Sequence, residues 1–403
     1  MDAHSIADYI KKEAKTLATH LSFVRHHLHA HPELSFHEFA TANFVEEELH
    51  KVGITTTRCT PTGIVGIIEG AHPGKVVALR ADLDALPIQE KSDATYASKN
   101  PGVMHACGHD VHTTCLLGAA KILFGLRAHL SGTIKLIFQP GEEVLPGGAS
   151  LMIDEGVLEN PEPDLLIAQH VFPSLPAGYV GFRNGMYMAS TDELHVTVKG
   201  KPGHAAMPKD YINPLVIAAR IIDRLQRDFM EEPIALLKQY NAPTVLAFGK
   251  IEGLGATNVI PAEVKLQGTF RTMNEEWREA AHTYMQQVAQ EIAANAGGTC
   301  EFRIEKGYPF LVNDDHVTNH ARAAAREYLG EEQVKELELR MTAEDFAWFS
   351  QRKPVCFYRL GTASPDGRNT HGVHTPEFDV DPKSLEVGSG LLAWIAASAL
   401  LGK

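Results

Sequence analysis

The sequence has few cysteines for its length: five in 403 residues, at positions 59, 107, 115, 300 and 356. The number is odd and the positions are scattered, which does not fit the paired framework of a disulfide-rich secreted protein. We therefore expect reduced thiols and a cytoplasmic location. A cysteine that stands among histidines, as Cys107 does, is then better explained as a ligand or a nucleophile than as half of a disulfide.

Long apolar runs and clusters of basic residues are also absent. The longest apolar run, LLAWIAASALL at residues 391–401, is shorter than the about 20 residues that cross a bilayer. The first residues, MDAHSIADYIKKEAK, lack the apolar core of a signal peptide. The 50 acidic and 37 basic residues give a net charge of -13, which disfavours binding to a phosphate backbone. We expect neither a membrane nor a nucleic acid as a partner.

What remains is a globular composition without internal repeats, long enough for two or three domains. After a helical pattern at 4–29, short apolar runs at 63–70, 75–86, 133–140 and 164–171 are separated by helical patterns at 110–126 and 147–156. This alternation predicts an α/β fold, a mixed central sheet with helices on both faces. The same pattern resumes after about residue 310, with a helix expected at 316–328, a strand in PVCFYRLG and a final helix at 383–401. We assign residues 1–186 and 308–403 to one domain; the ligand-type side chains described below make it the expected catalytic, metal-binding domain.

The pattern changes between these two segments. Strands and helices are expected at 191–200, 213–229, 244–253, 262–272, 275–296 and 300–307, in the order β-α-β-β-α-β. That order predicts a ferredoxin-like domain, a four-stranded sheet with both helices on one face. Residues 187–307 are therefore expected to form an inserted satellite domain that serves as a lid or for dimerisation.

Four separated segments carry side chains that bind metals. They supply Cys107 and His109 before a helix, Glu142 and Glu143 after the strand at 133–140, His170 at the end of the strand at 164–171, and His374 in HGVHTPEFD. No pair is decisive alone, because a buried cysteine with a capping histidine and a solvated Glu-Glu pair are common. In an open α/β sheet, however, functional groups gather at the carboxyl ends of the strands. We expect these side chains to converge.

The segment richest in histidine is RHHLHAHPELSFHE. It contains His26, His27, His29, His31 and His37. The segment covers the end of the first predicted helix and the following turn, and it has no acidic residue at ligand spacing, so we expect a structural role. Three further histidines are interpreted as neighbours of the ligands or as surface residues: His105, His112 and His371.

Nine segments carry a family resemblance. They are RADLDALP (80–87), MHACGHDVHTT (104–114), QPGEEVLPGGA (139–149), QH (169–170), GKPGHAAMP (200–208), TNVIP (257–261), GTFRT (268–272), TAEDFA (342–347) and HTPEFD (374–379). In this order, and across nearly the whole chain, they resemble the M20 metallopeptidase family. The resemblance is closer to its amidohydrolase branch, which includes N-acyl-L-amino acid amidohydrolases, hippurate hydrolases and auxin-conjugate hydrolases.

The resemblance implies two divalent metal ions. The implied ligands are Cys107, His109, Glu143, His170 and His374. Glu142 would be the general base that takes a proton from the attacking water and returns it to the departing amine. Mixed sulfur, nitrogen and oxygen ligation suits Zn, Mn, Co or Ni, and it is open whether Cys107 bridges the ions. Many relatives have a His-x-Asp ligand motif where this chain reads Arg80-Ala81-Asp82, so Asp82 is expected beside the ligands.

In the inserted domain the resemblance makes His204 a donor to the developing oxyanion, delivered by domain closure or from a partner subunit. It gives Asn258 and Arg271 contacts with the substrate, and a guanidinium suits an α-carboxylate. Glu344 would line the site. The expected reaction is hydrolysis of the linear amide of a small N-acyl amino acid or peptide-like substrate. The alternatives are a dipeptidase or carboxypeptidase and an inactive metal-binding relative, and a homodimer through the inserted domain is expected.

Overall fold

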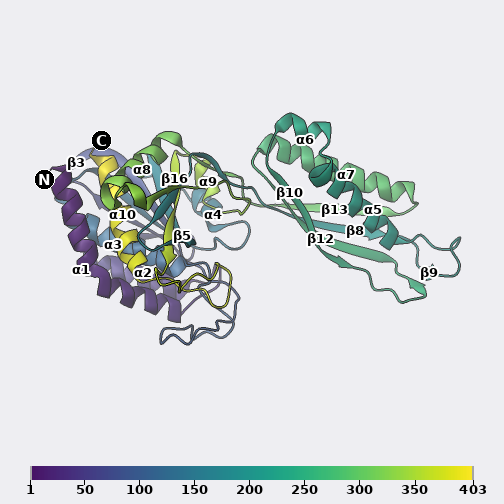
Figure 1. Ribbon diagram of the computed structural model, residues 1–403, viewed down its shortest axis with the longest axis horizontal. Coiled ribbons are helices and arrows are strands. Elements are labelled where there is room, and N and C mark those ends of the chain that lie inside the picture. The colour runs from purple at the N-terminus through teal and green to yellow at the C-terminus, as the bar shows by residue number, and fades with distance from the viewer. Residues whose placement is uncertain (1, 402–403) are drawn as a thin grey trace. The chain divides into compact units, whose positions relative to one another are not determined.

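The computed structural model describes residues 2–401, which divide into two compact units (Figure 1). The large unit consists of residues 2–185, 312–338 and 345–401, and the small unit of residues 186–311 and 339–344. The small unit is therefore an insertion, and a short second segment, 339–344, joins it after the chain has re-entered the large unit. Two short strands lie where the chain passes between the units, β7 (Gly185–Met188) and β14 (Leu311–Asn313).

A mixed eight-stranded sheet forms the centre of the large unit. Its spatial order is β1 (Thr56–Cys59), β2 (Gly63–Glu69), β4 (Ser131–Gln139), β3 (His72–Asp82), β5 (Leu165–Pro176), β16 (Val355–Ala363), β6 (Val180–Phe182) and β15 (Val334–Glu336). The four central strands β4, β3, β5 and β16 are parallel, whereas β1, β2 and β6 introduce antiparallel pairs. All residues of β16 are buried, as expected for a strand that is covered on both faces.

Helices cover both faces of this sheet. They are α1 (Ala3–Ala30), α2 (Phe39–Val52), α3 (His109–Leu126), α4 (Gly148–Asp154), α8 (Asp315–Leu329), α9 (Ala347–Ser350) and α10 (Lys383–Leu400), with 3-10 turns at Arg127–His129 and Glu331–Gln333. Leu360 of β16 packs against Gly388 of α10. Phe357 packs on Phe346, which immediately precedes α9, with ring centroids 5.4 Å apart. Residues three apart on a strand point to opposite faces, so α9 and α10 lie on opposite sides of the sheet.

Helix α10 contains the longest apolar run of the sequence. Nearly every residue of α10 is buried, and it packs against α1, α3 and α8. A helix that is apolar on all sides belongs in the core of a large domain. Within residues 2–401, no helix combines the length and the apolarity that a bilayer-spanning segment needs.

The small unit is a separate α/β domain. Its antiparallel sheet has the order β10 (Thr244–Glu252), β12 (Glu263–Thr272), β8 (Asp192–Lys199) and β13 (Thr299–Lys306). Helices α5 (Pro214–Gln226) and α7 (Glu275–Asn295) cover one face of it (Figure 1). The short elements are β9 (Gly203–His204), the π-helical turn Arg227–Glu231, α6 (Ala235–Tyr240) and β11 (Val259–Ile260).

Local sequence explains the small unit well. Asn213 caps α5 by accepting a hydrogen bond from the backbone N–H of Leu215, with Pro214 as the first helical residue, and Asn274 caps α7 in the same way. In β8 the buried residues Leu194 and Val196 alternate with more exposed ones. This alternation fits a sheet that is covered on one face only. The order of β8, α5, β10, β12, α7 and β13 along the chain confirms the β-α-β-β-α-β arrangement that the sequence predicts.

Candidate metal centre

The carboxyl ends of the central parallel strands bring the candidate metal ligands together. Strands β3 and β4 end side by side, with Asp82 opposite Gln139. Glu142 and Glu143 follow directly after β4. His170 lies in β5, opposite Arg359 of β16. Because these strands run in the same direction, the residues that follow them gather at one edge of the sheet.

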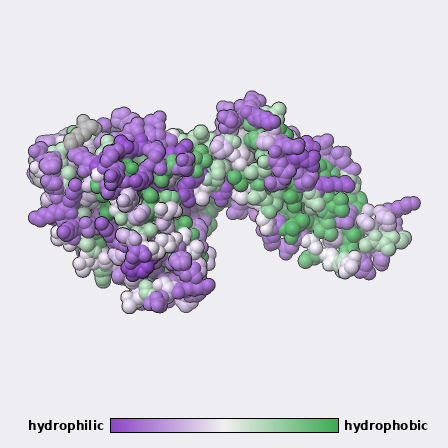
Figure 2. Space-filling model, viewed as in Figure 1, coloured by the Kyte–Doolittle hydropathy of each residue, from purple (hydrophilic) through white to green (hydrophobic). Residues whose placement is uncertain are grey.

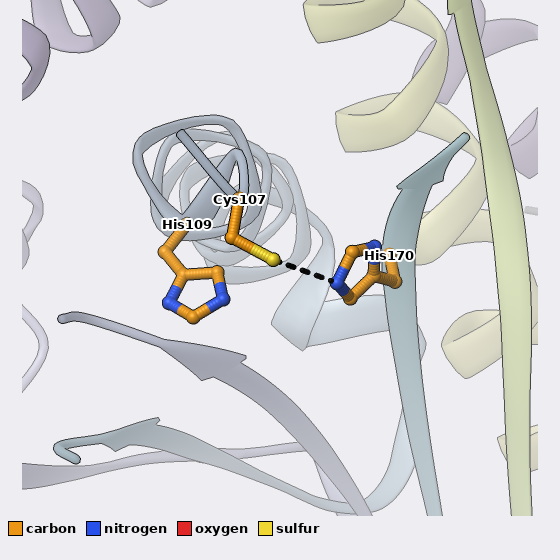
Figure 3. Close-up of side chains that lie close together, drawn as sticks. All are labelled: Cys107, His109 and His170. Atoms are coloured by element: carbon orange, nitrogen blue, oxygen red, sulfur yellow. Dashed lines mark hydrogen bonds between the residues drawn. The ribbon is translucent and has the colours of Figure 1, made fainter. Parts of the chain in front are cut away.

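Cys107 and His109 reach this edge from the loop that begins α3. Gly108 between them caps α3 in the left-handed conformation, with φ +79°. A Cβ atom on Gly108 would lie 2.6 Å from Val171 Cγ2, so the loop packs tightly against β5. The sulfur of Cys107 lies 3.4 Å from Nε2 of His170, and both residues lie beside His109 (Figure 3).

Glu143 and His374 complete the cluster. Nε2 of His374 lies 3.2 Å from Oε1 of Glu143. Nε2 of His109 lies 3.9 Å from a carboxylate oxygen of Glu142 and 3.9 Å from one of Glu143. The backbone N–H of His374 donates to the carbonyl of Ala106, over 2.7 Å, which joins its segment to the Cys107 loop.

The structure therefore brings all five predicted ligands together. Two groups of potential ligand atoms, each within 4.8 Å of one another, share the sulfur of Cys107. One group contains Cys107, His109 and His170, and the other contains Cys107, Glu143 and His374. A third group joins His109 to Glu142 and Glu143. The sulfur, nitrogen and oxygen atoms in these groups are donors that divalent metal ions bind in proteins.

Hydrogen bonds orient two of the three histidine ligands. Nδ1 of His170 donates to the carbonyl oxygen of Val171 over 2.8 Å, and Nδ1 of His109 lies 3.1 Å from Oδ1 of Asp84. Each imidazole thus turns Nε2 toward the cluster, as metal-binding histidines do. Among residues 2–401, no hydrogen bond reaches Nε2 of His109 or Oε1 of Glu143, although both atoms are buried. Oε1 of Glu143 does lie 3.2 Å from Nε2 of His374, in an ion-pair contact. Buried polar atoms without a hydrogen bond are rare, and a cation would satisfy both.

His112 differs from the ligands in its hydrogen bonds. Its Nδ1 lies 2.6 Å from Oδ1 of Asp82, and its Nε2 accepts the backbone N–H of Val171 over 2.9 Å. Both ring nitrogens are used, so His112 supports the site without facing it. His105 is also buried, but neither of its nitrogens has a hydrogen bond among the described residues.

The electrostatics of the cluster fit a positively charged occupant. Burial raises the pKa of the Cys107 thiol well above its usual value, and the carboxylates of Glu143 and Glu142 raise it further. Burial alone would lower the pKa of His109, but Asp82 and Asp84 outweigh it and raise that pKa to about 10. Burial lowers the pKa of His170, which keeps this imidazole neutral and able to bind a metal. A divalent cation offsets the negative charge and makes a bound thiol give up its proton.

Asp82 is engaged by other groups. Nη1 of Arg80 donates to Oδ2 of Asp82 over 2.6 Å, while His112 occupies Oδ1. The same guanidinium reaches Oδ1 of Asp345 over 2.8 Å, and Gln139 donates to both oxygens of Asp345. Asp82 thus lies beside the ligands, as the Arg80-Ala81-Asp82 motif led us to expect.

Two carboxylates that support the site were not singled out in the sequence. Asp84 contacts His109, accepts from the hydroxyl of Ser35 over 2.6 Å, and accepts from the backbone N–H of Glu143 over 3.0 Å. The sequence feature that could have indicated Asp84 is the motif RADLDALP, in which a second aspartate follows Asp82 two residues later. Asp345 accepts a hydrogen bond from the guanidinium of Arg80. The only sequence feature that could have indicated Asp345 is its position in the motif TAEDFA.

The small unit carries the remaining candidates. His204 is exposed and pairs with Val259 in the β9–β11 ladder, and the backbone N–H of Ala205 donates to the carbonyl of Asn258. His204 and Asn258 are therefore neighbours. Arg271 lies near the end of β12, where Phe270 pairs with Asp192. From Glu263, the first residue of β12, to Arg271 the strand spans eight residues, roughly 26 Å at 3.3 Å per residue, so Arg271 is remote from His204, which lies beyond the start of β12.

A mixed α/β unit with sulfur, imidazole and carboxylate groups converging at its strand ends defines a metal-dependent hydrolase. The sequence profile of peptidase family M20/M25/M40 matches residues 78–398, and the chain belongs to this family. Within the family it is a metal-dependent amidohydrolase, as its similarity to curated amidohydrolases shows.

Three relatives illustrate the similarity. The N-acyl-L-amino acid amidohydrolase of Geobacillus stearothermophilus is 41% identical over 323 residues, which cover 79% of this chain and 85% of the relative. Thermostable carboxypeptidase 2 of Saccharolobus solfataricus is 36% identical, covering 95% of this chain and 96% of the relative. The crystal structure of a dinuclear metal binding peptidase from the M20 family of Bacillus subtilis is 35% identical and matches with a TM-score of 0.81, over 96% of this chain and 99% of that chain.

Proposed function

We propose that the protein hydrolyses the amide bond of N-acyl amino acids or similar conjugates, releasing a carboxylic acid and a free amino acid. Two divalent ions, Zn, Mn, Co or Ni, would be held by the five convergent side chains. The observation that carries the proposal is the pair of overlapping ligand groups around Cys107, next to the buried carboxylate of Glu142. The similarity to an N-acyl-L-amino acid amidohydrolase supports this substrate class.

The chain's own residues divide the chemistry between them. Bound divalent ions would supply Lewis acidity, which polarises the amide carbonyl and acidifies water. The backbone N–H of Asp345 donates to Oε1 of Glu142 over 3.4 Å, which orients this carboxylate at the cluster. Glu142 would accept a proton from the attacking water and deliver it to the amide nitrogen as the C–N bond breaks. The products are then a carboxylate and an amine.

The small unit would supply the groups that recognise the substrate. We assign the oxyanion contact to His204 and substrate contacts to Asn258 and Arg271. Nη1 of Arg271 is buried and has no hydrogen-bond partner among the described residues, so it is a donor suited to a carboxylate. Because His204 and Arg271 lie far apart within one small unit, a single substrate can meet both only if two copies of the chain contribute to a site.

A homodimer through the small unit fits this requirement. Strand β10 is an edge of its sheet, with one side unpaired. Apolar side chains are exposed close to this edge, among them Leu215 and Val216 of α5, Ile251 of β10 and Leu254. Figure 2 shows apolar atoms gathered on the viewed face of the small unit. Light scattering after size exclusion, with Val216→Lys as the interface variant and Lys209→Gln as a surface control, tests the dimer.

A carboxypeptidase is the second candidate, because thermostable carboxypeptidase 2 is similar over nearly the whole chain. An inactive relative that only binds metal is the third candidate. It is disfavoured because Glu142, the proposed general base, is present beside the proposed ligand Glu143. The cytoplasmic location stays a proposal that rests on the five free cysteines. Separation of cytoplasmic and secreted fractions of the source cells tests it.

The decisive experiment is an assay of N-acetyl amino acids, hippurate and dipeptides with the protein loaded with Mn²⁺ or Zn²⁺, or treated with chelator. We expect cleavage of the acylated substrates that chelator abolishes and added metal restores. Cleavage that survives complete removal of metal would contradict the mechanism. Preferential release of a C-terminal residue from peptides would favour the carboxypeptidase, and no cleavage of any substrate by the loaded protein would favour the inactive relative.

A further inference from the structure

The segment RHHLHAHPELSFHE contains a buried ion network that the catalytic assignment does not use. Arg25 and His29 lie one turn apart on α1 and are 2% and 1% exposed. Nε of Arg25 donates to Oδ2 of Asp110 over 2.8 Å, and Nδ1 of His29 lies 2.7 Å from the same oxygen. The other ring nitrogen of His29 lies 3.3 Å from Oε1 of Glu90. His29 therefore does have acidic partners, but they come from distant parts of the chain.

The same guanidinium binds a second carboxylate. Nη2 of Arg25 lies 2.9 Å from Oδ1 of Asp379, and the hydroxyl of Tyr96 donates to the other oxygen of Asp379 over 2.9 Å. The guanidinium carbon of Arg25 lies 4.9 Å from the centroid of the Tyr96 ring. Arg25 therefore joins Asp110, the residue after His109, to Asp379, which lies in the segment that carries His374.

His374 needs such an anchor more than the other candidate ligands do. Its side chain is 51% exposed, and residues 371–381 form no helix or strand. Its backbone has φ +64°, an unfavourable conformation for a residue other than glycine. By contrast, His109 begins a long helix, and His170 lies within a strand of the central sheet. The position of His374 relative to Cys107 therefore depends on contacts made by its own segment.

Few contacts fix that segment. The backbone N–H of His374 is bound to Ala106, the carbonyl of Pro376 accepts from the backbone N–H of Lys91, and Phe378 is buried. The bond between Arg25 and Asp379 adds a charge pair in which Arg25 is buried and Asp379 is partly exposed. A charged hydrogen bond of this kind is stronger and more directional than a neutral one. Through its two ion pairs, Arg25 links the Asp110 segment to the Asp379 segment.

We propose that Arg25 is a positioning residue that holds the His374 segment at binding distance from the Cys107–His109 loop. It thereby sets the affinity for the ion that uses His374. This inference rests on the proposed function, because it takes His374 as a ligand. It assigns no chemical step to Arg25, which lies behind the cluster and acts through Asp110 and Asp379. Loss of this support would weaken the binding of one ion and leave the other ion bound.

Asp379→Asn is the sharpest test, because it removes one charge from the network at a partly exposed side chain. The metal-free protein would be titrated with Co²⁺, followed by calorimetry and by the thiolate-to-cobalt absorption that reports Cys107. We expect two binding events in the wild type. In the variant the tighter event and the absorption should be unchanged, while the weaker event loses about tenfold or more in affinity, as for residues that support metal ligands.

Asp366→Asn is the matched control. Asp366 lies in the same connection between β16 and α10, but its partner is the exposed Arg368. This variant should bind both ions like the wild type. Tyr96→Phe keeps the Arg25 bond and removes only the hydroxyl bond to Asp379, so a smaller loss in the weaker event is expected. Arg25→Gln should reproduce the Asp379→Asn result, and Arg25→Lys should recover part of the affinity.

The outcomes separate this inference from the proposed function. A wild type that binds fewer than two ions would overturn the proposed dinuclear site, whatever the variants do. A wild type that binds two ions, together with Asp379→Asn and Tyr96→Phe proteins that bind both with unchanged affinity, would overturn the role of Arg25 alone. Equal weakening of both events in Asp379→Asn would show a general structural defect and would also contradict the role. If Arg25→Gln fails to fold, the other two variants still decide.

Discussion

Replacing Gly108 with alanine tests how tightly the Cys107–His109 loop is built. The backbone of Gly108 has φ +79°, and the left-handed region costs other residues about 1–2 kcal/mol. The added methyl group would also lie 2.6 Å from Val171 Cγ2 and 2.9 Å from Val171 Cγ1. Overpacking of this kind costs about 1–3 kcal/mol. The two contributions predict a free energy of unfolding that is lower by about 2–5 kcal/mol.

Gly102→Ala separates the two contributions. Gly102 has φ +78°, almost the same as Gly108, but no heavy atom lies within 4 Å of the position where its Cβ would be. Both glycines lie in the large unit. Alanine at position 102 therefore adds the backbone strain and the change in the unfolded chain without the steric clash. The difference between the two variants should be the clash, about 1–3 kcal/mol.

The assay is urea denaturation of the metal-free protein followed by circular dichroism, with metal titration of the folded variants. Gly108→Ala should also weaken metal binding, because the clash pushes the loop away from Val171 and so moves Cys107 away from His170. Adding Val171→Ala to Gly108→Ala removes the two Cγ atoms. The double variant should therefore recover part of the lost stability and part of the lost metal affinity. If Gly108→Ala is no less stable than Gly102→Ala, the reasoning about close packing is refuted.

Three further results are expected. Glu142→Gln should bind metal like the wild type and lose about 10²–10⁴-fold in kcat; a comparable loss of metal would show that Glu142 is a ligand. His112→Ala should weaken metal binding by about 10–100-fold, because it releases Asp82 and Val171, and unchanged metal titration would contradict this. His109 has its pKa raised from 6.5 to about 10 in the folded, metal-free protein. Its contribution to stability is full below pH 6.5 and declines as the pH rises to about 10. The metal-free wild type should therefore lose more stability than His109→Asn between pH 7 and 10, and equal losses would refute the assignment.

The sequence predicts the long elements of the fold and misses short ones. The helices expected at 110–126 and 383–401 are found at His109–Leu126 and Lys383–Leu400. Both helices contain long apolar runs, and most of their residues are buried, as the sequence pattern predicts. The edge strand β15 and its neighbour β6, three residues each, were not predicted, because such short segments carry no readable period. Helix α2 was also missed, because its mixed composition follows a turn rich in histidine.

Contacts between distant segments could not be read from the sequence either. Arg80 and Asp345 are 265 residues apart, and Arg25 and Asp110 are 85 residues apart. Nothing in local spacing indicates which carboxylate a given arginine meets. The candidate ligands were easier to find, since all but His374 lie just before a predicted helix or at or just after the end of a predicted strand. A rule about strand ends places them at one edge without any knowledge of the individual contacts.

Hydrogen bonds then separate the ligands from their neighbours, a distinction that residue type cannot make. Asp82 and His112 are as close to His109 as a ligand would be, but both oxygens of Asp82 and both nitrogens of His112 already have partners. Nε2 of His109 and Oε1 of Glu143 have no hydrogen bond among the described residues and face the same space. Each unpaired buried polar atom carries a desolvation cost. A fold that keeps two such atoms together beside a thiol, while it satisfies their neighbours, is arranged for a cation to bind there.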